Sequence, residues 1–349
     1  NINKKLRKIN PQSGIYILRQ DYHGKIYRFQ NNEEKTILVT GGSGFIGSVN
    51  CKLLVDSGYN VINVDRVKRA IEGVTQYPFD INNSQIKGVI EMTKPDAIIH
   101  LAALHSVPKS IAEAKQYYVN NVENSIKLLD HAIDGGVKHI IFSSSSSVYG
   151  DSDNLLNSEI DSTNPKTPYG RTKAMVETIL EDLSAVHDFT YNSLRYFCAA
   201  GSYEGFGYQL DPKEHIMPIL VDKALNGGQF VVNGDDYDTI DGTCVRDYTH
   251  VLDIATAHLA SLNYLLDGGE NGVFNIGAGS PKSIKQVIAE VEAQTGNTVD
   301  VAYGPKREGD TAKTDANISK AMDLLGWEPV SSLEDIVRTE IDFQSSKKK

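Results

Sequence analysis

The sequence predicts an α/β fold, in which a doubly wound parallel sheet carries a second, smaller α/β lobe. Apolar strands and helical segments alternate from residue 36 to about residue 200, as is typical of a parallel sheet covered on both faces. A glycine-rich turn follows the first strand, and a later strand ends in serines, followed by a tyrosine and a lysine four residues apart. The expected strands lie near 36–40, 60–65, 97–103, 138–145 and 190–197.

The first strand, turn and helix predict a dinucleotide site of the Rossmann-like kind. Thr36–Thr40 is an apolar, β-branched run expected to form a buried strand, and Phe45–Val55 is expected to form a helix. The glycines between them permit a tight turn and let a pyrophosphate approach the helix N-terminus, where unpaired N–H groups favour an anion. The alternative is a glycine-rich turn without a ligand. The residues expected at the pyrophosphate are Gly41, Gly44, Phe45, Ile46 and Gly47.

Two aspartates after the next strand predict which dinucleotide binds. Asp65 ends the strand Tyr59–Asp65, where a carboxylate accepts hydrogen bonds from a ribose diol and repels a 2′-phosphate. It therefore favours NAD over NADP, although the neighbouring Arg66 works against that preference. Asp80 follows Tyr77–Phe79 and is either placed at the adenine edge or is an ordinary loop aspartate.

The serine-rich strand and the tyrosine–lysine pair predict a proton-transfer site. His139–Ser145 ends in hydroxyl groups, and the carboxyl ends of strands face the ligand crevice of such a sheet. Tyr169 and Lys173 lie on a helix expected to begin at Pro168, so that the two side chains share one face. A tyrosine has a reference pKa near ~10, and a neighbouring ammonium favours its phenolate. The alternatives are a polar loop and a solvated helix face.

Composition limits the classes of partner. The chain has 349 residues, 40% of them apolar, which is enough for about two lobes. A net charge of -10 disfavours nucleic acid and anionic membrane surfaces, and no apolar run is long enough to span a bilayer or to form a signal-peptide core at the start. The three cysteines have no metal-ligand spacing, and neither do the nine histidines, so we expect a cytoplasmic protein without disulfides or metal.

The pattern of segments predicts the domain limits. Residues 1–35 stand apart as an N-terminal extension of unknown role that contains a possible hairpin at 14–18 and 25–29. Residues 36–200 form the predicted dinucleotide-binding domain. Residues 201–246 and 278–345, with helices at 216–226 and 281–295, form the smaller lobe. Residues 247–277 are expected to return to the first domain, because Val273–Gly277 resembles a further strand of its sheet.

Several blocks of sequence carry a resemblance to a known family. They are Val39–Ser48, Phe142–Gly150, Pro168–Lys173, Leu194–Phe197, Asp241–Tyr248 and Arg307–Asp310. The chain resembles the extended short-chain dehydrogenase/reductases and, within them, the UDP-glucose (UDP-galactose) 4-epimerases, from about residue 36 to residue 342. The first three blocks mark the superfamily, and the last two mark the epimerase branch.

The resemblance implies an isomerase that uses NAD to invert C4 of a UDP-sugar. It implies that Tyr169 is the base and acid at the sugar 4-hydroxyl, that Lys173 holds the nicotinamide ribose and lowers the tyrosine pKa, and that Ser145 shares the hydroxyl proton. The other cofactor-binding residues that it implies are Ile81, Leu101, Ala102, Ala103, His105, Asn120, Ser143 and Tyr196. The substrate-binding residues that it implies are Cys198, His215, Ile216, Asn233, Arg246, Arg307, Asp310 and Thr314.

Departures from the family pattern concern the ligands. His105 stands where many bacterial epimerases have lysine, Cys198 and His215 stand where asparagines are usual, and Asn233 replaces an aromatic expected near uracil. These changes indicate a different or broader nucleotide sugar. Thr314 is a small residue where a tyrosine restricts epimerases to unsubstituted hexoses, so N-acetylated sugars are also expected to fit.

Two other functions remain as alternatives. A 4,6-dehydratase or a UDP-glucuronate decarboxylase needs acidic side chains after the catalytic hydroxyl, where this chain has Ser146 and Ser147. A non-enzymatic NAD-sensing protein has no use for a base such as Tyr169.

The resemblance also implies a homodimer, with an apolar stripe at the interface; the alternative is that the stripe faces only the sheet. The stripe comprises Val122, Ile126, Leu129 and Ile133.

Overall fold

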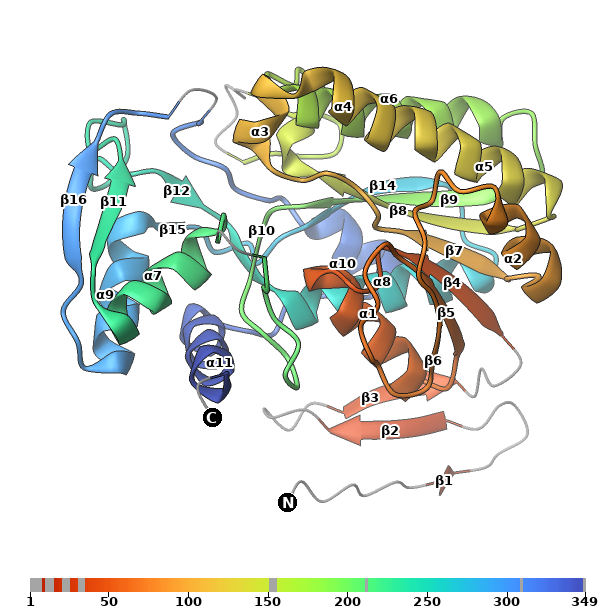
Figure 1. Cartoon of the computed structure of the whole chain (residues 1–349), viewed down its shortest axis with the longest axis horizontal. Coiled ribbons are helices and arrows are strands. Elements are labelled where there is room, and N and C mark those ends of the chain that lie inside the picture. Colours follow the sequence, from red (N-terminus) through yellow and green to blue (C-terminus); the bar gives the residue numbers. More distant parts are fainter. Residues whose placement is uncertain are drawn as a thin grey trace.

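A seven-stranded parallel sheet forms the centre of the larger lobe in the computed structural model (Figure 1). The structure describes residues 8–9, 16–20, 26–30, 35–150, 156–210, 213–307 and 310–347. The strand order is β14-β9-β8-β7-β4-β5-β6, and every neighbouring pair is parallel. The strands are β4 (Thr36–Thr40), β5 (Asn60–Val64), β6 (Val74–Tyr77), β7 (Ala97–His100), β8 (His139–Ser145), β9 (Thr190–Tyr196) and β14 (Gly272–Ile276).

Helices cover both faces of this sheet, which explains why its strands are apolar on both sides. Along β4, Ile37 and Val39 face one core and Leu38 faces the other. On the first face lie α1 (Phe45–Asp56), α8 (Val251–Leu266) and α10 (Ser319–Leu325). On the second lie α2 (Gln85–Thr93), α5 (Asn124–Asp134) and α6 (Pro168–Ser184). The predicted doubly wound sheet is confirmed, and the expected return of residues 273–277 to it is confirmed by the pairing of β14 with β9.

The helices beside the expected tyrosine begin and turn in specific ways. Thr167 caps α6 by accepting a hydrogen bond from Gly170 N–H, and Pro168 occupies its first turn. Before α5 the chain forms α3 (Val107–Ala112), α4 (Ala114–Tyr118) and a π-helical turn, η1 (Val119–Glu123). A π-helical turn widens the helix by one residue and often marks a functional region. A short 3₁₀ turn, η2 (Ser146–Val148), follows β8.

The second lobe is smaller and has its own apolar core. Its helices are α7 (Ile216–Asn226), α9 (Ile284–Thr295) and α11 (Leu333–Ser346). Its strands form pairs: β11 (Gln229–Asn233) with β16 (Asp300–Gly304), and β12 (Val245–Arg246) with β15 (Lys282–Ser283). A third pair joins β10 (Cys198–Ala200), which follows β9, to β13 (Tyr248–His250), which leads into α8. Figure 1 shows this lobe beside the carboxyl ends of β8 and β9.

The N-terminal segment forms a separate antiparallel sheet. Its strands are β1 (Lys8–Ile9), β2 (Tyr16–Gln20) and β3 (Ile26–Gln30), in the order β1-β2-β3. The pairing of β2 with β3 confirms the expected hairpin, although it lies one or two residues later than predicted. Within the described residues, none of the helices has the length and apolar character needed to cross a membrane.

Candidate active site

The expected proton-transfer residues meet at the carboxyl end of β8. Lys173 Nζ lies 5.8 Å from the centre of the Tyr169 ring and donates a hydrogen bond to Ser143 O at 2.5 Å. It also lies 4.9 Å from the centre of the Phe142 ring. A hydrogen bond joins the Tyr169 side chain to Ser145. One helix and one strand end therefore supply the phenol, the ammonium and the hydroxyl.

The electrostatics of this group differ from the expectation in one respect. Burial raises the pKa of Tyr169, and the hydrogen bond with Ser145 only partly opposes it. Burial also lowers the pKa of Lys173 to about 7, against the attraction of Glu177. The expected lowering of the Tyr169 pKa by Lys173 is therefore wrong for the protein without ligand, because both groups lose water and the ammonium is itself disfavoured. Any lowering has to come from charge that a bound ligand adds.

The glycine turn has the geometry that a dinucleotide requires. Gly41 has φ +76°, and a Cβ there would lie 2.7 Å from Ala102 N. A Cβ at Gly47 would lie 2.1 Å from Gly41 O, so neither position accepts a side chain. Gly44 caps α1 without a side-chain hydrogen bond, and Phe45 and Ile46 begin the helix. The first N–H groups of α1 are therefore available to an anion.

Asp65 lies at the rim of this turn. Its carboxylate accepts hydrogen bonds from Ser43 N and Val67 N, both at 2.9 Å, which hold it beside the glycines. Arg66, which was expected to oppose Asp65, instead faces Asp80, with Nε to Oδ2 at 3.7 Å. Asp80 also accepts a hydrogen bond from Asn82 N, and the following Ile81 is buried. Arg66 is therefore engaged with Asp80 and not with Asp65.

The loop after β7 is held by an asparagine that the sequence interpretation did not select. Asn121 accepts a hydrogen bond from Leu104 N at 2.8 Å and donates to Leu104 O at 2.9 Å. It also donates to Thr172 Oγ1 on α6, and the expected Asn120 donates to Asn121. The π-helical turn η1 carries both asparagines, and such a turn leaves no periodic signal that would separate them. This loop contains the expected cofactor residues Leu101, Ala102, Ala103 and His105.

Tyr196 and Ser143, two further expected cofactor residues, lie near the carboxyl ends of neighbouring strands of the sheet. The Tyr196 hydroxyl is hydrogen-bonded to His258 Nε2 and to the Ser143 side chain. His258 Nδ1 lies 2.9 Å from Ile254 O, so the ring carries its proton there and Nε2 accepts from Tyr196. Tyr196 is buried, and both hydrogen bonds of its hydroxyl are made within the protein.

A second group of expected residues lies where β10, β12 and the segment after β16 meet. Arg246 Nη2 lies 3.5 Å from Asp310 Oδ1, and Arg246 Nη1 donates to Val245 O at 3.0 Å. Cys198 lies beside them; burial raises the pKa of its thiol to about 11, although Arg246 opposes the shift. Thr314 N donates to Val245 O at 3.0 Å, which places it next to Arg246. A single guanidinium near a carboxylate fits a site for a diphosphate and its ribose.

A third group joins the two lobes. His215, directly before Ile216 and α7, has its ring centre 5.7 Å from that of His105 and 4.6 Å from that of Tyr208. The Phe45 ring also belongs to this group, with its centre 6.2 Å from that of the His215 ring. Burial lowers the pKa of His215 to about 4, so the ring is neutral at neutral pH. An ion pair between Lys109 and Glu214 lies alongside. Tyr208 and Glu214 were not predicted, and no motif marks them.

Two expected side chains stay apart from these groups. Asn233 ends β11 opposite Gly304, and Arg307 is exposed, although its carbonyl accepts a hydrogen bond from the backbone of Asp310 in the second group. Among the described residues, no three His, Cys, Asp or Glu side chains gather as a metal site requires.

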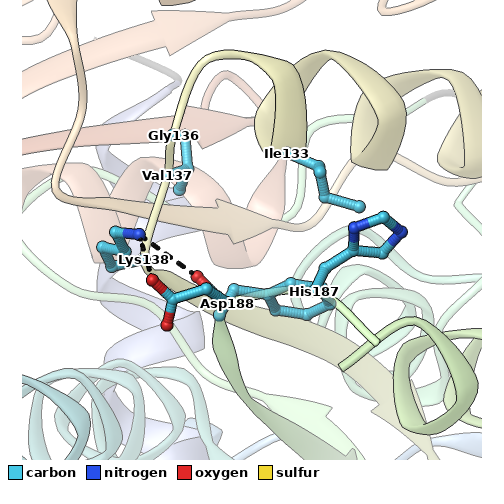
Figure 2. A pocket seen from close by; sticks show the side chains of 7 residues that line it. Ile133, Gly136, Val137, Lys138, His187 and Asp188 are labelled. Atoms are coloured by element: carbon cyan, nitrogen blue, oxygen red, sulfur yellow. Dashed lines mark hydrogen bonds and ion pairs between the residues drawn. The ribbon is translucent and has the colours of Figure 1, made fainter. Parts of the chain in front are cut away.

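A small surface pocket of about 90 Å³ lies at the opposite edge of the sheet, where β8 and β9 begin (Figure 2). An exposed ion pair between Lys138 and Asp188 forms its rim, with Nζ to Oδ2 at 2.6 Å. Ligands of doubly wound sheets bind at the carboxyl ends of the strands, so this pocket is not the candidate site.

The fold and the site together define an NAD-dependent short-chain dehydrogenase/reductase. The model of the NAD dependent epimerase/dehydratase family matches residues 37–277, and the chain belongs to this family. The UDP-glucose 4-epimerase of Rhizobium meliloti (strain 1021) is 38% identical over 324 residues, which cover 90% of this chain and 98% of the relative.

Solved structures agree with this assignment. UDP-glucose 4-epimerase from Brucella ovis in complex with NAD superposes with a TM-score of 0.84 at 36% identity, covering 88% of this chain and 98% of that one. UDP-N-acetylglucosamine 4-epimerase from Methanobrevibacter ruminantium M1, in complex with UDP-N-acetylmuramic acid, has a TM-score of 0.80 at 30% identity, covering 90% and 99% of the two chains.

Proposed function

We propose that the protein is an isomerase that inverts C4 of a UDP-sugar, interconverting UDP-glucose and UDP-galactose. The observation that carries the proposal is the meeting of Tyr169, Lys173 and Ser145 beside a dinucleotide turn bordered by Asp65. The relatives that share this fold over nearly their whole length are UDP-glucose 4-epimerases.

The chemistry follows from the inertness of the C4 hydrogen, which is not acidic. Bound NAD supplies a reversible hydride acceptor, so that C4 passes through a ketone and can be reduced from the other face. Tyr169 takes the 4-hydroxyl proton and returns it, with Ser145 sharing the hydrogen bond. Lys173 compensates the phenolate charge. Because the cofactor returns to its starting state in each turnover, the protein can keep it bound.

The second lobe would hold the nucleotide. Arg246 would pair with the diphosphate and Asp310 with the ribose, and the neighbouring positions of the two side chains, 3.5 Å apart, support this assignment. The exposed Arg307 would add a second guanidinium. Cys198, His215, Ile216, Asn233 and Thr314 would line the remainder of the substrate site, and the small Thr314 leaves room for an acetamido group.

Dehydration or decarboxylation of a nucleotide sugar fits the site less well than epimerisation. Ser147 N–H donates to Ser145 Oγ at 3.2 Å, and η2 contributes only hydroxyls after the catalytic serine. Elimination or decarboxylation without a positioned acid would be slow. A protein that only senses NAD would have no use for the phenol and ammonium pair.

We also propose a homodimer and a division into lobes at about residues 200 and 278, with 247–277 and the helix α10 in the first lobe. Exposed apolar side chains gather on α3, η1, α5 and α6, which pack against one another: Ile111, Val119, Ile126 and Met175. A second copy of the chain is the occupant that this apolar face fits. The three free cysteines fit a reducing compartment such as the cytoplasm.

The test is NMR of UDP-glucose and UDP-galactose, each incubated with the purified protein without added cofactor. Each sugar should yield the same mixture of both. Unchanged sugars would refute the proposal, and a 4-keto-6-deoxy or decarboxylated product would favour a sister reaction.

A further inference from the structure

The proton-transfer groups belong to two separate elements whose relative position has to be fixed. Tyr169 and Lys173 lie on α6, whereas the Ser145 hydroxyl and the Ser143 carbonyl lie at the end of β8. Catalytic groups need to be held within about 0.5 Å of their productive geometry by residues that are themselves held in place. A link between α6 and β8 is therefore required close to these side chains.

Glu177 supplies such a link from one helical turn beyond Lys173. Ser144 Oγ, between Ser143 and Ser145, donates a hydrogen bond to Glu177 Oε1 at 2.5 Å. Because side chains alternate along a strand, Ser144 points to the same face as Ile140 and Phe142, the face that α6 covers, and it is fully buried. The hydrogen bond thus attaches the strand end to the helix that carries Tyr169.

Arg195 on the next strand holds Glu177 in turn. Its Nε donates to Glu177 Oε1 at 3.0 Å and its Nη2 to Oε2 at 2.7 Å, and it lies opposite Ser144 in the sheet register. The guanidinium lies 4.8 Å from the centre of the Tyr149 ring, and the Tyr149 hydroxyl donates to Asn275 Oδ1 on β14 at 2.7 Å. The link therefore extends from α6 across β8, β9 and β14.

The energetics of buried ion pairs favour a role in positioning. Glu177 and Arg195 are both almost fully buried, and desolvation offsets most of the attraction within such a pair. An apolar pair of equal volume would stabilise the lobe as well. An apolar pair would offer no acceptor for the Ser144 hydrogen bond. The Glu177 carboxylate accepts hydrogen bonds from both Ser144 and Arg195 and is therefore held from two directions.

We propose that Glu177, held by Arg195, is a positioning residue that sets the distance between Ser145 and Tyr169 through Ser144. The inference rests on the proposed function for its catalytic consequence. It does not assign Glu177 any contact with substrate or cofactor.

The test is Ser144→Ala, which removes the link and leaves the Glu177–Arg195 pair intact. Ser193→Ala is a matched control, because Ser193 lies on the adjacent strand, is equally buried, and its Oγ has no hydrogen-bond partner among the described residues. On protein purified with its own cofactor, Ser144→Ala should lower kcat roughly tenfold, less than the ~10²–10⁴ that loss of the base itself costs, with KM and bound NAD unchanged. Ser193→Ala should match wild type.

A second readout does not depend on turnover. The tyrosinate absorbance of a protein minus that of its Tyr169→Phe counterpart reports the ionisation of Tyr169. Misplacing Ser145 removes a hydrogen bond that favours the phenolate, so Ser144→Ala should raise the apparent pKa of Tyr169 above that of wild type, and Ser193→Ala should not. An unaltered Tyr169 titration in Ser144→Ala, together with a kcat within twofold of wild type, would overturn the inference. Wild-type protein without sugar interconversion would refute the proposed function instead, and the titration alone would then decide the positioning role.

Discussion

Lys173 Nζ lies 5.8 Å from the centre of the Tyr169 ring, and its hydrogen bond goes to the Ser143 carbonyl. The ammonium is thus tied to the strand and faces the phenol without contacting its oxygen. Since burial disfavours both charged forms, the resting pair consists of a neutral phenol and a lysine with a pKa of about 7. Proton transfer by this pair is expected to require bound ligands.

Tyr169→Phe should abolish epimerisation while leaving NAD bound. The change removes only the hydroxyl, so the ring still fills its site, and loss of a positioned general base costs about 10²–10⁴ in rate. Sugar interconversion followed by NMR gives the rate, and nucleotide released from the denatured variant gives the cofactor content. A rate within a few-fold of wild type would exclude Tyr169 as the base.

The purified protein should carry NAD and not NADP. Two backbone N–H groups orient Asp65 at the rim of the glycine turn, and its negative charge repels a 2′-phosphate. Acid extraction and chromatography identify the nucleotide. Asp65→Ala should weaken the preference for NAD by roughly tenfold or more, equivalent to about 1.4 kcal/mol. NADP in the wild-type extract would show that Arg66 outweighs Asp65, despite its contact with Asp80.

The parts of the molecule that the sequence predicts are those encoded locally. The strand, turn and helix at 36–56 and the spacing of Tyr169 and Lys173 depend on neighbours within a few residues. The pairing of β11 with β16 joins residues about seventy positions apart, and short partly polar strands carry little periodic signal. The edge strand β6 is likewise short and partly polar.

The candidate site shows the same contrast between locally encoded features and features that depend on tertiary contacts. Ser145 was predicted because it ends a strand, whereas Ser144, Glu177 and Arg195 gain their meaning only from tertiary contacts. Asn121, which holds the loop after β7, was not predicted, because no periodic signal in the π-helical turn distinguishes it from Asn120. Of the predicted apolar stripe, Leu129 is buried against the sheet and Ile126 is partly exposed, since one face of α5 serves the core.

Glu340→Gln should remove part of the pH dependence of stability. Glu340 is almost fully buried on α11, accepts one hydrogen bond from Gln344, and has no partner for Oε2 in the described part of the chain. Burial raises its pKa to about 7, so the folded protein holds a proton that the unfolded chain releases at lower pH. The stability from this carboxyl is present in acid and is lost as the pH rises through about 7.

We therefore compare the unfolding free energy of Glu340→Gln with that of wild type at pH 5 and at pH 8. The difference, variant minus wild type, should be on the order of 1–3 kcal/mol larger at pH 8 than at pH 5. Urea denaturation at the two pH values measures it. Sugar interconversion should be unaffected, because Glu340 is buried on α11 and belongs to none of the groups of the candidate site. An equal stability difference between variant and wild type at both pH values would contradict the prediction.

The protein should be a dimer that charged substitutions on the apolar helical face dissociate. Ile126 on α5 and Met175 on α6 are 37% and 43% exposed, and burying such side chains drives association. Light scattering at micromolar concentration should give twice the chain mass for wild type and the chain mass for Ile126→Glu with Met175→Glu. Ile240→Glu is the matched control, since Ile240 is 85% exposed in the other lobe and should leave the dimer intact. A monomeric wild type would mean that these helices serve only the sheet.

The width of the sugar pocket should be set at Thr314. Its N–H donates to the carbonyl of Val245, so the residue lies beside Arg246 and Cys198, where the diphosphate-linked sugar is expected. A small side chain there leaves space for an acetamido group, and a tyrosine would exclude it by steric clash. Wild type should interconvert UDP-GlcNAc and UDP-GalNAc as well as the simple hexoses. Thr314→Tyr should suppress the N-acetyl reaction by roughly tenfold or more, while UDP-galactose turnover stays within a few-fold. NMR of both sugar pairs with each protein measures this. Equal loss of both activities, or no N-acetyl activity in wild type, would show that Cys198, His215 and Asn233 have reshaped the pocket so that position 314 no longer lines it.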